Sequence, residues 1–546
     1  MRSKDIPQTY AQALARAARA WPDTEALVVG AERLSYAELW RNVRRVAGNL
    51  KRLGLRRGEH FAICLGNSAE WVTLAYAIAT LGAVVIPVNT RFKRDELRYC
   101  LEQSDASMLA VPDAFLNIDF VEMLRGICAL DAPLPDPRLP LLRRVIVFGA
   151  SAPRGTLGGD ELERDCERLP DEQSEGVDAD DVALIQYTSG TTSHPKGVML
   201  THRGMLTDAY HVGQRMGLAP ADRYFSPRPL FHVSGTTLSM LTSMMAGATY
   251  LTTPRFDPGE ALHVMAAERC THTSGNDTMF LMMLAHPDLR RHKLQLRCAW
   301  AAVTYGVMQR IREEMGVDGL CSAYGLSEAS PNVAMAPHDD DLEKRLSGYA
   351  KLLPGVEVRI VDVETGSDQA PYRSGEILVR GWNVMKGYYK MPEQTAKALD
   401  GEGWLHTGDL GEMDDAGRLR FIDRLKDMLR VGGENVAPVE IEDVLNAHPA
   451  VKQAQVFGVP DARLVEVPAA YVTLKPGEHA QPAELIAWCK TRCASFKVPR
   501  YLRIIDSFDA IGMTGSGKVQ RNKLRAFALA DLGLGQQPAA AAAPRR

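Results

Sequence analysis

The segment Tyr187-Thr-Ser-Gly-Thr-Thr-Ser-His-Pro-Lys-Gly197 gathers hydroxyl groups, glycines and a lysine within one short run. Its glycines allow backbone N–H groups to approach an anion closely. Lys196 supplies a point charge for phosphate oxygens. Gly197 stands where a Walker P-loop carries Ser or Thr after the lysine, so that motif is excluded. The segment predicts a polyphosphate-binding loop of another kind, with a polar surface turn as the alternative.

A second lysine closes the run Gly512-Met-Thr-Gly-Ser-Gly-Lys518, which satisfies GxxxxGK. Val519 replaces the hydroxyl residue that would bind magnesium in a P-loop. We therefore expect Lys518 to lie on a mobile catalytic loop rather than in a P-loop.

The elements around these loops alternate between strand and helix patterns. Ser35 and Glu38 form a predicted capping box that begins a helix. Apolar runs at 61–65, 83–88 and 182–185 predict buried strands. This alternation indicates a parallel sheet covered by helices. Short alternating runs at 355–387 predict antiparallel hairpins, and a compact α+β unit is predicted after Lys426.

The composition is that of an ordinary soluble protein of more than one domain, with 546 residues and 46% hydrophobic residues. A formal net charge of −3 does not indicate binding to nucleic acid or to an anionic membrane surface. The nine cysteines show no metal-ligand spacing, which favours reduced thiols in the cytoplasm. No secretory signal and no membrane span are predicted.

Four segments occur in the order found in AMP-forming acyl-CoA synthetases: 187–198, 323–328 (AYGLSE), 403–411 (GWLHTGDLG) and 424–442. The chain resembles this family, which belongs to the adenylate-forming superfamily of acyl-CoA ligases, peptide-synthetase adenylation domains and luciferases. Weaker matches at 34–39, 79–91 and 517–525 extend the resemblance over about residues 30 to 530.

The resemblance implies a role for each matching residue. Lys196 and the loop before it would hold the β- and γ-phosphates of ATP, and Glu328 would ligate Mg²⁺. Tyr324 would stack on adenine, Asp409 would accept the ribose hydroxyls, and Arg424 would orient the ribose. The nucleotide-binding set implied in this way is Thr188, Ser189, Gly190, Thr191, Thr192, Tyr324, Ser327, Asp409 and Arg424.

The resemblance also implies a second half-reaction. Lys518 would bridge the substrate carboxylate and the α-phosphate, and Lys426 would be the hinge between two domains. Gly432 and Gly433 would then replace Lys518 at the active site and line a pantetheine tunnel. His232 matches a position that borders the acyl pocket, although a lone histidine is more often structural.

Three departures from the family pattern bear on the acyl pocket and the loops. Ser193 replaces a phosphate-loop glycine, and Gly512 replaces a proline. The segment Ala302-Val-Thr-Tyr305 stands where the family commonly has Gly-Gly-Ala-Pro. Larger side chains there are expected to reshape the pocket, so the sequence leaves the acid open among medium-chain, aromatic, alicyclic and steroid-derived classes.

The resulting prediction is an α/β enzyme: a large N-terminal ATP- and acyl-binding domain at 1–425, made of two α/β subdomains and a small β-barrel. A smaller mobile α+β lid domain at 427–532 and a disordered tail at 533–546 follow. The predicted reaction joins a small-molecule carboxylic acid to coenzyme A at the expense of ATP, with Mg²⁺, as in fatty acid metabolism. A homodimer is compatible with the sequence, which leaves the oligomeric state open.

Two alternatives remain at this point. The first is an acyl-AMP ligase that loads a separate carrier protein, for which free CoA would be a poor acceptor. The second is a non-catalytic nucleotide-binding relative, which would release no pyrophosphate.

Overall fold

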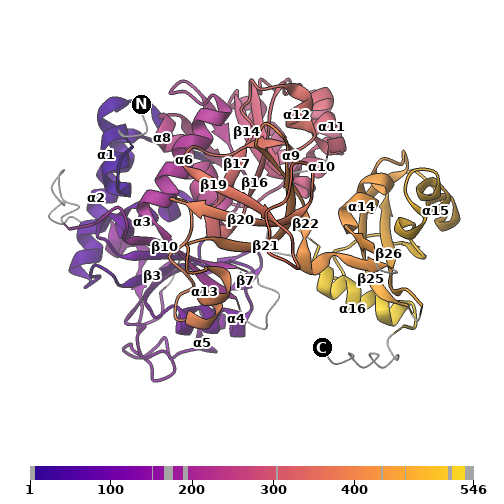
Figure 1. Ribbon diagram of the computed structural model, residues 1–546. Helices are drawn as coiled ribbons and strands as arrows, with labels where there is room; N and C mark the ends of the chain where they lie inside the picture. The colour runs from indigo at the N-terminus through magenta and orange to yellow at the C-terminus, as the bar shows by residue number, and fades with distance from the viewer. Residues whose placement is uncertain are drawn as a thin grey trace. The chain divides into compact units, whose positions relative to one another are not determined.

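The computed structural model describes residues 6–150, 152–164, 176–188, 195–302, 305–431, 434–461, 463–513 and 519–534. The chain forms two compact units (Figure 1). The first contains Met1–Arg359, Leu378–Thr407 and Asp414–Leu419, and the second contains Ile360–Ile377, Gly408–Met413 and Arg420–Arg546.

A seven-stranded sheet of order β11-β10-β4-β3-β5-β8-β9 forms one layer of the first unit. Its strands are parallel except for β11, which pairs antiparallel with β10. The inner strands are apolar throughout because helices or loops cover both faces of such a sheet. The strands are β3 (His60–Ile63), β4 (Val84–Pro87), β5 (Ala106–Pro112), β8 (Arg144–Phe148), β9 (Leu157–Gly158), β10 (Val182–Thr188) and β11 (Lys196–Thr201).

A second sheet has eight strands in the order β17-β16-β15-β14-β12-β13-β1-β2. The strands from β16 to β1 are parallel, and the two edge strands run antiparallel to their neighbours. The strands are β1 (Glu25–Val29), β2 (Glu32–Ser35), β12 (Arg223–Phe225), β13 (Thr249–Thr252), β14 (His272–Asn276), β15 (Cys298–Ala302), β16 (Gly319–Gly325) and β17 (Asn332–Met335). A two-stranded hairpin, β6 (Ala114–Phe115) with β7 (Ile118–Asp119), stands apart.

Local signals set the helix starts as the sequence predicts. The Ser35 side chain accepts from the Glu38 N–H while Glu38 reaches back to Ser35, which confirms the capping box. Helices of the first unit are α1 (Tyr10–Ala20), α2 (Tyr36–Arg52), α3 (Ala69–Thr80), α4 (Arg94–Gln103), α5 (Phe120–Arg125), α6 (His202–Met216), α7 (Val233–Gly235), α8 (Thr242–Ala246), α9 (Pro258–Ala267), α10 (Asp277–Leu284), α11 (Tyr305–Met315), α12 (Leu342–Leu346) and α13 (Pro392–Ala398). Short 3₁₀ helices are η2 (Gly159–Leu162), η4 (Pro287–Arg291) and η5 (Ser327–Ala329), and η3 (Thr236–Leu241) is a π-helix.

Helix α6 joins the two large sheets. It follows β11 in the chain and contacts β15, β16 and β17 of the second sheet (Figure 1). Its left-handed C-cap, Gly217, ends the helix as glycine commonly does. Because α6 contacts both sheets, it fixes the end of the β10–β11 hairpin relative to the second sheet.

The segment with predicted hairpins forms a five-stranded sheet of order β18-β22-β21-β20-β19. Its strands are β18 (Ala350–Lys351), β19 (Val356–Val361), β20 (Gly375–Gly381), β21 (Leu405–Met413) and β22 (Arg418–Arg424).

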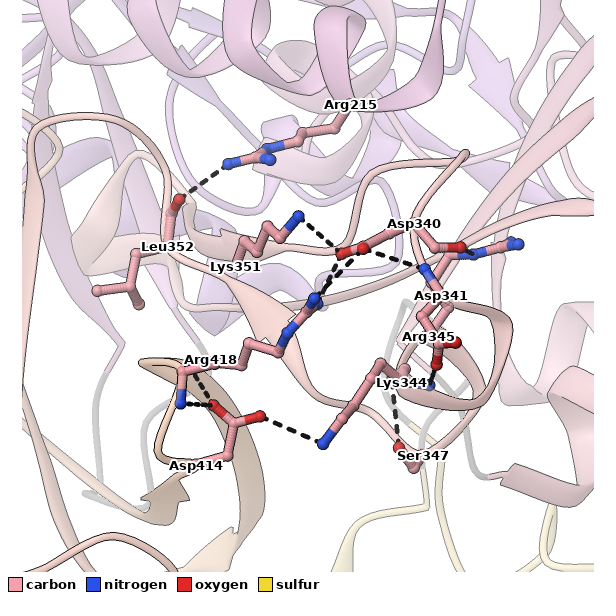
Figure 2. A network of polar contacts seen from close by, with 11 residues as sticks. Arg215, Asp340, Asp341, Lys344, Arg345, Ser347, Lys351, Leu352, Asp414 and Arg418 are labelled. Carbon is pink, nitrogen blue, oxygen red and sulfur yellow. Dashed lines mark hydrogen bonds and ion pairs between the residues drawn. The ribbon is translucent and has the colours of Figure 1, made fainter.

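A network of ion pairs within the first unit links residues 340–351 with Asp414 and Arg418 (Figure 2). The Asp340 carboxylate accepts from Arg418 at 2.6 Å and from Lys351 at 3.1 Å. Asp414 accepts from the Lys344 ammonium at 3.3 Å. The Asp340 and Arg418 side chains are only 11% and 14% exposed, so their attraction is poorly screened by solvent. The hydrogen bonds from Arg418 hold the pKa of Asp340 well below its usual range.

The second unit contains the predicted α+β fold. Its sheet has the order β24-β23-β26-β25, with β27 parallel to β26. Helix α14 packs on β25, α15 on β27, and α16 on β25 (Figure 1). The elements are η6 (Leu425–Asp427), β23 (Leu429–Val431), β24 (Glu434–Val436), α14 (Pro438–Asn446), β25 (Val451–Asp461), β26 (Val465–Leu474), α15 (Pro482–Lys490), η7 (Ser495–Lys497), β27 (Tyr501–Ile504) and α16 (Arg521–Asp531).

Among the described helices, none is both long enough and apolar enough to cross a membrane. The described cysteines are free thiols, and all but Cys493 are buried.

Candidate functional site

The β10–β11 hairpin presents the two ends of the phosphate loop. Thr188 at the end of β10 pairs with Lys196 at the start of β11. The residues between them that sequence reasoning assigned to phosphate binding, Ser189, Gly190, Thr191 and Thr192, lie outside the described residues. The described part therefore fixes where the loop leaves and re-enters the sheet.

Tyr388 connects Lys196 with Glu328. The Lys196 ammonium lies 4.5 Å from the centroid of the Tyr388 ring. The Tyr388 hydroxyl donates a 2.9 Å hydrogen bond to Oε1 of Glu328. Burial raises the pKa of Tyr388, and the neighbouring Glu328 raises it further, so the phenol keeps its proton. Tyr388 thus contacts an ammonium through its ring and a carboxylate through its hydroxyl.

The turn that carries Glu328 is fixed by backbone hydrogen bonds. Met385 N–H donates to the Glu328 carbonyl at 2.9 Å, and Leu326 N–H donates to the Pro331 carbonyl at 2.8 Å. Ser327 lies in the same turn, η5. A side chain at Gly325 would place its Cβ 2.1 Å from the Pro331 carbonyl oxygen, so only glycine fits there.

The strand after this turn is clamped by two buried polar side chains. Asp208 on α6 accepts from the Asn332 N–H at 2.7 Å. The Asn383 amide donates to the Asn332 carbonyl at 3.0 Å. Both clamping side chains have no exposed surface. Burial raises the pKa of Asp208 well above its usual value, so its neutral form is favoured.

Tyr324 lies at the end of β16, where it pairs with Ala334 of β17. It is 7% exposed. The carboxyl ends of parallel strands are where ligands bind in open α/β sheets, so its position suits the predicted contact with a base.

In the second unit, Asp409 of β21 lies 3.5 Å from the Arg424 guanidinium of β22. Asp409 is 5% exposed, and the Arg424 side chain is 54% exposed. Lys426 follows in η6, and burial lowers its pKa. The structure therefore brings together Asp409 and Arg424, the two residues predicted to bind the ribose. Arg424 lies two residues before Lys426, the predicted hinge.

Arg521 anchors the flanks of that hinge. Its guanidinium lies 3.3 Å from the Asp423 carboxylate and 3.0 Å from the Glu442 carboxylate. Asp423 also accepts from the Arg424 N–H at 2.8 Å.

His232 has a structural role in its local turn. Its Nδ1 accepts from the Ser234 N–H at 3.1 Å and so caps α7. Asn276 likewise caps α10 by accepting from the Met279 N–H at 2.9 Å. The role of His232 at the acyl pocket stays a prediction.

Three predicted residues, Gly432, Gly433 and Lys518, lie outside the described residues. Gly512, which begins the loop of Lys518, has a φ of +132°. Proline is locked near about −65°, so the family's proline does not fit this backbone. Here the departure noted in the sequence corresponds to a different loop conformation.

Sequence reasoning missed Tyr388, Asp208 and Asn383. Each acts on a residue distant in the chain, and no local pattern marks such contacts. The run Lys386-Gly-Tyr-Tyr389 offered only a weak signal, because its glycine favours a turn but does not say what the tyrosines contact.

Comparison with known proteins agrees with this fold. The model of the family "AMP-binding enzyme" matches residues 14–389, and that of the "AMP-binding enzyme C-terminal domain" matches residues 440–518. The putative acyl-CoA synthetase YngI of Bacillus subtilis is 38% identical over 95% of this chain and 97% of its own length. The 3-[(3aS,4S,7aS)-7a-methyl-1,5-dioxo-octahydro-1H-inden-4-yl]propanoyl:CoA ligase of Rhodococcus jostii is 37% identical over 95% of this chain and 98% of its own.

A solved structure gives the same result for the fold. The anthranilate CoA ligase AuaEII in complex with anthranoyl-AMP superposes with a TM-score of 0.86 and 27% identity, over 98% of this chain and all of the other. Fold and site thus define an adenylate-forming α/β enzyme with a large N-terminal and a smaller C-terminal domain. The chain belongs to the AMP-binding enzyme family and is an AMP-forming acyl-CoA synthetase.

Proposed function

We propose that Lys196, Tyr388 and Glu328 form the phosphate end of the ATP site in this acid–CoA ligase. The observation that carries the proposal is the position of Tyr388, whose ring contacts Lys196 and whose hydroxyl binds Glu328. Lys196 neutralises β- and γ-phosphate oxygens. Tyr388 holds the Glu328 carboxylate in one orientation while Ser327 binds the α-phosphate.

The residues present fit a magnesium ion. Glu328 offers a carboxylate oxygen, the ligand type that Mg²⁺ prefers, and the ion needs few protein ligands when phosphates supply the rest. When bound with ATP, Mg²⁺ stabilises negative charge on the phosphates during transfer. The Tyr388 hydroxyl donates to Oε1 of Glu328, so Oε2 would be the oxygen that holds the ion.

Asp409 and Arg424 bind the ribose in this proposal. Asp409 accepts both ribose hydroxyls through its buried carboxylate, which lies beside Arg424. Tyr324 stacks on the adenine ring.

For the two half-reactions, we propose the residue roles that the family resemblance implies. Lys518 bridges the acid and the α-phosphate during adenylation. Residues 427–532 then turn about Lys426 so that Gly432 and Gly433 line the path of the CoA thiol. The N-terminal domain of this scheme ends at residue 425. Arg521 forms ion pairs with Asp423 and Asp427, which flank Lys426, and this arrangement supports a hinge there.

The acid activated by the enzyme is a small organic carboxylic acid. The relatives include medium-chain acyl-CoA ligases of mammals, such as that of Bos taurus at 34% identity, and the Rhodococcus ligase acts on a propanoyl side chain of a ring system. We propose that the enzyme acts in fatty acid or ring-acid metabolism, and that it does so in the cytoplasm, as the sequence predicts.

The proposal is tested by incubating the enzyme with ATP, Mg²⁺, free CoA and a panel of acids. It predicts an acyl-CoA by mass spectrometry, together with equal amounts of AMP and pyrophosphate. Acyl-adenylate without thioester would instead favour the carrier-loading alternative. Absence of pyrophosphate with every acid would contradict the proposal.

A further inference from the structure

A buried arginine lies at the carboxyl edge of the eight-stranded sheet. Arg228 follows β12 and is 8% exposed. One of its terminal nitrogens, Nη2, donates to the Gly275 carbonyl at the end of β14. Its guanidinium carbon lies 4.1 Å from the centroid of the Trp300 ring on β15. The loop residue thus reaches across two neighbouring strands.

Arg228 has hydrogen-bonding capacity that no described residue uses. Its Nε is buried and has no hydrogen-bond partner among the described residues. Within the described part of the chain, no carboxylate lies within ion-pair distance of Arg228, and Asp277 acts on its charge only from farther away. A carbonyl and an indole face offset part of the desolvation of a cation, and an anion would offset far more.

The guanidinium keeps its charge in this setting. Burial lowers the pKa of Arg228 to about 10, which is still well above neutral pH. A positive charge therefore lies inside the sheet edge at physiological pH.

The support beneath Arg228 is rigid and already satisfied. Trp300 Nε1 donates to the Tyr224 hydroxyl at 2.8 Å. The Ser226 hydroxyl lies 3.0 Å from that of Ser274 and accepts from Ser239 at 2.8 Å. These side chains form hydrogen bonds with one another and hold the Trp300 ring in place. None of these hydrogen bonds uses an N–H group of Arg228. Such a fixed second layer is typical of a binding group rather than of a loose surface arginine.

The register places Arg228 at the level of the predicted acyl pocket. Phe225, the last residue of β12, pairs with Thr273, three residues before β14 ends, so Arg228 lies three residues beyond the end of its own strand. Asn276 pairs with Ala302, so the ends of β14 and β15 are level. The carbonyl that Arg228 binds is on β14, two strands from β16 and Tyr324. At about 4.8 Å per strand, the guanidinium lies ~10 Å across the sheet edge from the strand of the predicted adenine contact.

We propose that Arg228 binds a second carboxylate at the far end of the acyl chain, so that the enzyme activates dicarboxylic acids at one end. This inference rests on the proposed function of the same site. A guanidinium recognises a carboxylate through paired N–H donors, and the Nε–H of Arg228 is available for one of them. The separation across the sheet edge suits a short, linear diacid.

The wild-type enzyme provides the first test. Succinate, glutarate, adipate and suberate are compared with butanoate, pentanoate, hexanoate and octanoate in a CoA-ligation assay. The inference predicts that one diacid exceeds its matched monoacid at least tenfold in kcat/KM. Preference for the monoacid at every length would overturn it and leave the proposed function intact. No thioester with any acid would contradict the proposed function itself.

The variant Arg228→Met provides the second test. It should lose at least 100-fold in kcat/KM for the preferred diacid, mainly through KM, while gaining activity with the matched monoacid. Arg228→Lys should retain an intermediate preference. Arg255→Met, an exposed arginine of the same unit, is the matched control and should change neither.

A purely structural role for Arg228 predicts a different pattern. Arg228→Met would then lower activity with diacid and monoacid equally, and that outcome overturns the inference. If Arg228→Met does not fold, the inference is tested by measuring how much each acid raises the Tm of the wild-type enzyme. Glutarate or adipate, added with a non-hydrolysable ATP analogue, should raise the Tm more than pentanoate or hexanoate, and equal shifts would refute the proposal.

Discussion

The hydroxyl of Tyr388 donates a 2.9 Å hydrogen bond to the Glu328 carboxylate while its ring lies against the Lys196 ammonium. Tyr388 therefore orders two opposite charges without neutralising either. Both charges stay available for a magnesium–triphosphate complex, which itself carries both signs. This relationship is the structural basis of the proposed phosphate site.

Replacing Tyr388 with phenylalanine removes the hydrogen bond and keeps the ring beside Lys196. A hydrogen bond to a charged group is worth about 1.5–3 kcal/mol, so kcat/KM for MgATP should fall by roughly tenfold or more. The decrease in kcat/KM should be smaller at high Mg²⁺ concentration, because a larger fraction of the Glu328 carboxylates then binds the ion. Pyrophosphate release at varied ATP and Mg²⁺ measures both effects.

Tyr389→Phe is the matched control for this change. The Tyr389 hydroxyl donates to Asp105 at 2.8 Å and does not bind Glu328. Its loss should leave kcat/KM for MgATP within twofold of wild type. An equal effect of both variants would show that Tyr388 has no special role.

The Asp208 clamp should give stability an unusual pH dependence. Burial raises the folded-state pKa of Asp208, so its contribution is fully present below the unfolded pKa near 3.8 and is lost as pH rises toward the folded value. Asp208→Asn stays neutral and removes this dependence. Between pH 5 and pH 8, urea unfolding should show a smaller loss of stability in Asp208→Asn than in wild type. Identical pH profiles would mean that Asp208 is ionised in the folded protein.

The Asp340–Arg418 pair should give stability the opposite dependence on pH. The hydrogen bonds from Arg418 lower the folded-state pKa of Asp340, so the stability it supplies is present above about pH 4 and is lost as pH falls further. Arg418→Met should cost roughly 2 kcal/mol at neutral pH and move acid unfolding to higher pH.

Lys351→Met is the control for the network in Figure 2. The Lys351 side chain is 45% exposed, against 14% for Arg418, so solvent screens its charge more strongly. Its loss should cost less than half as much. A larger effect of Lys351→Met would contradict the central place given to Arg418.

The sequence predicted the elements whose signals are local. The cap at Ser35 lies where it is predicted, because a capping box acts within a few residues. Lys196, Glu328 and Asp409 were found through long motifs. Tyr388 and Asp208 were not found, because they act on residues 60 and 124 positions away. Only the folded chain brings such partners together.

The order of the half-reactions supplies a prediction for residues assigned from sequence. Lys518→Ala should abolish formation of the acyl-adenylate and leave thioester formation from added acyl-adenylate largely unchanged. Gly433→Trp should do the reverse, because a bulky side chain blocks the thiol path. Quenched-flow assays of each half-reaction measure both. Equal loss in the two assays for Lys518→Ala would refute its role.

The most direct test of the account is exchange of labelled pyrophosphate into ATP in the absence of CoA. If an acyl-adenylate forms first at the site of Lys196, Tyr388 and Glu328, exchange depends on the acid, needs no CoA, and falls in Tyr388→Phe but not in Tyr389→Phe. Exchange that requires CoA, or thioester formed with ADP and phosphate as products, would contradict it.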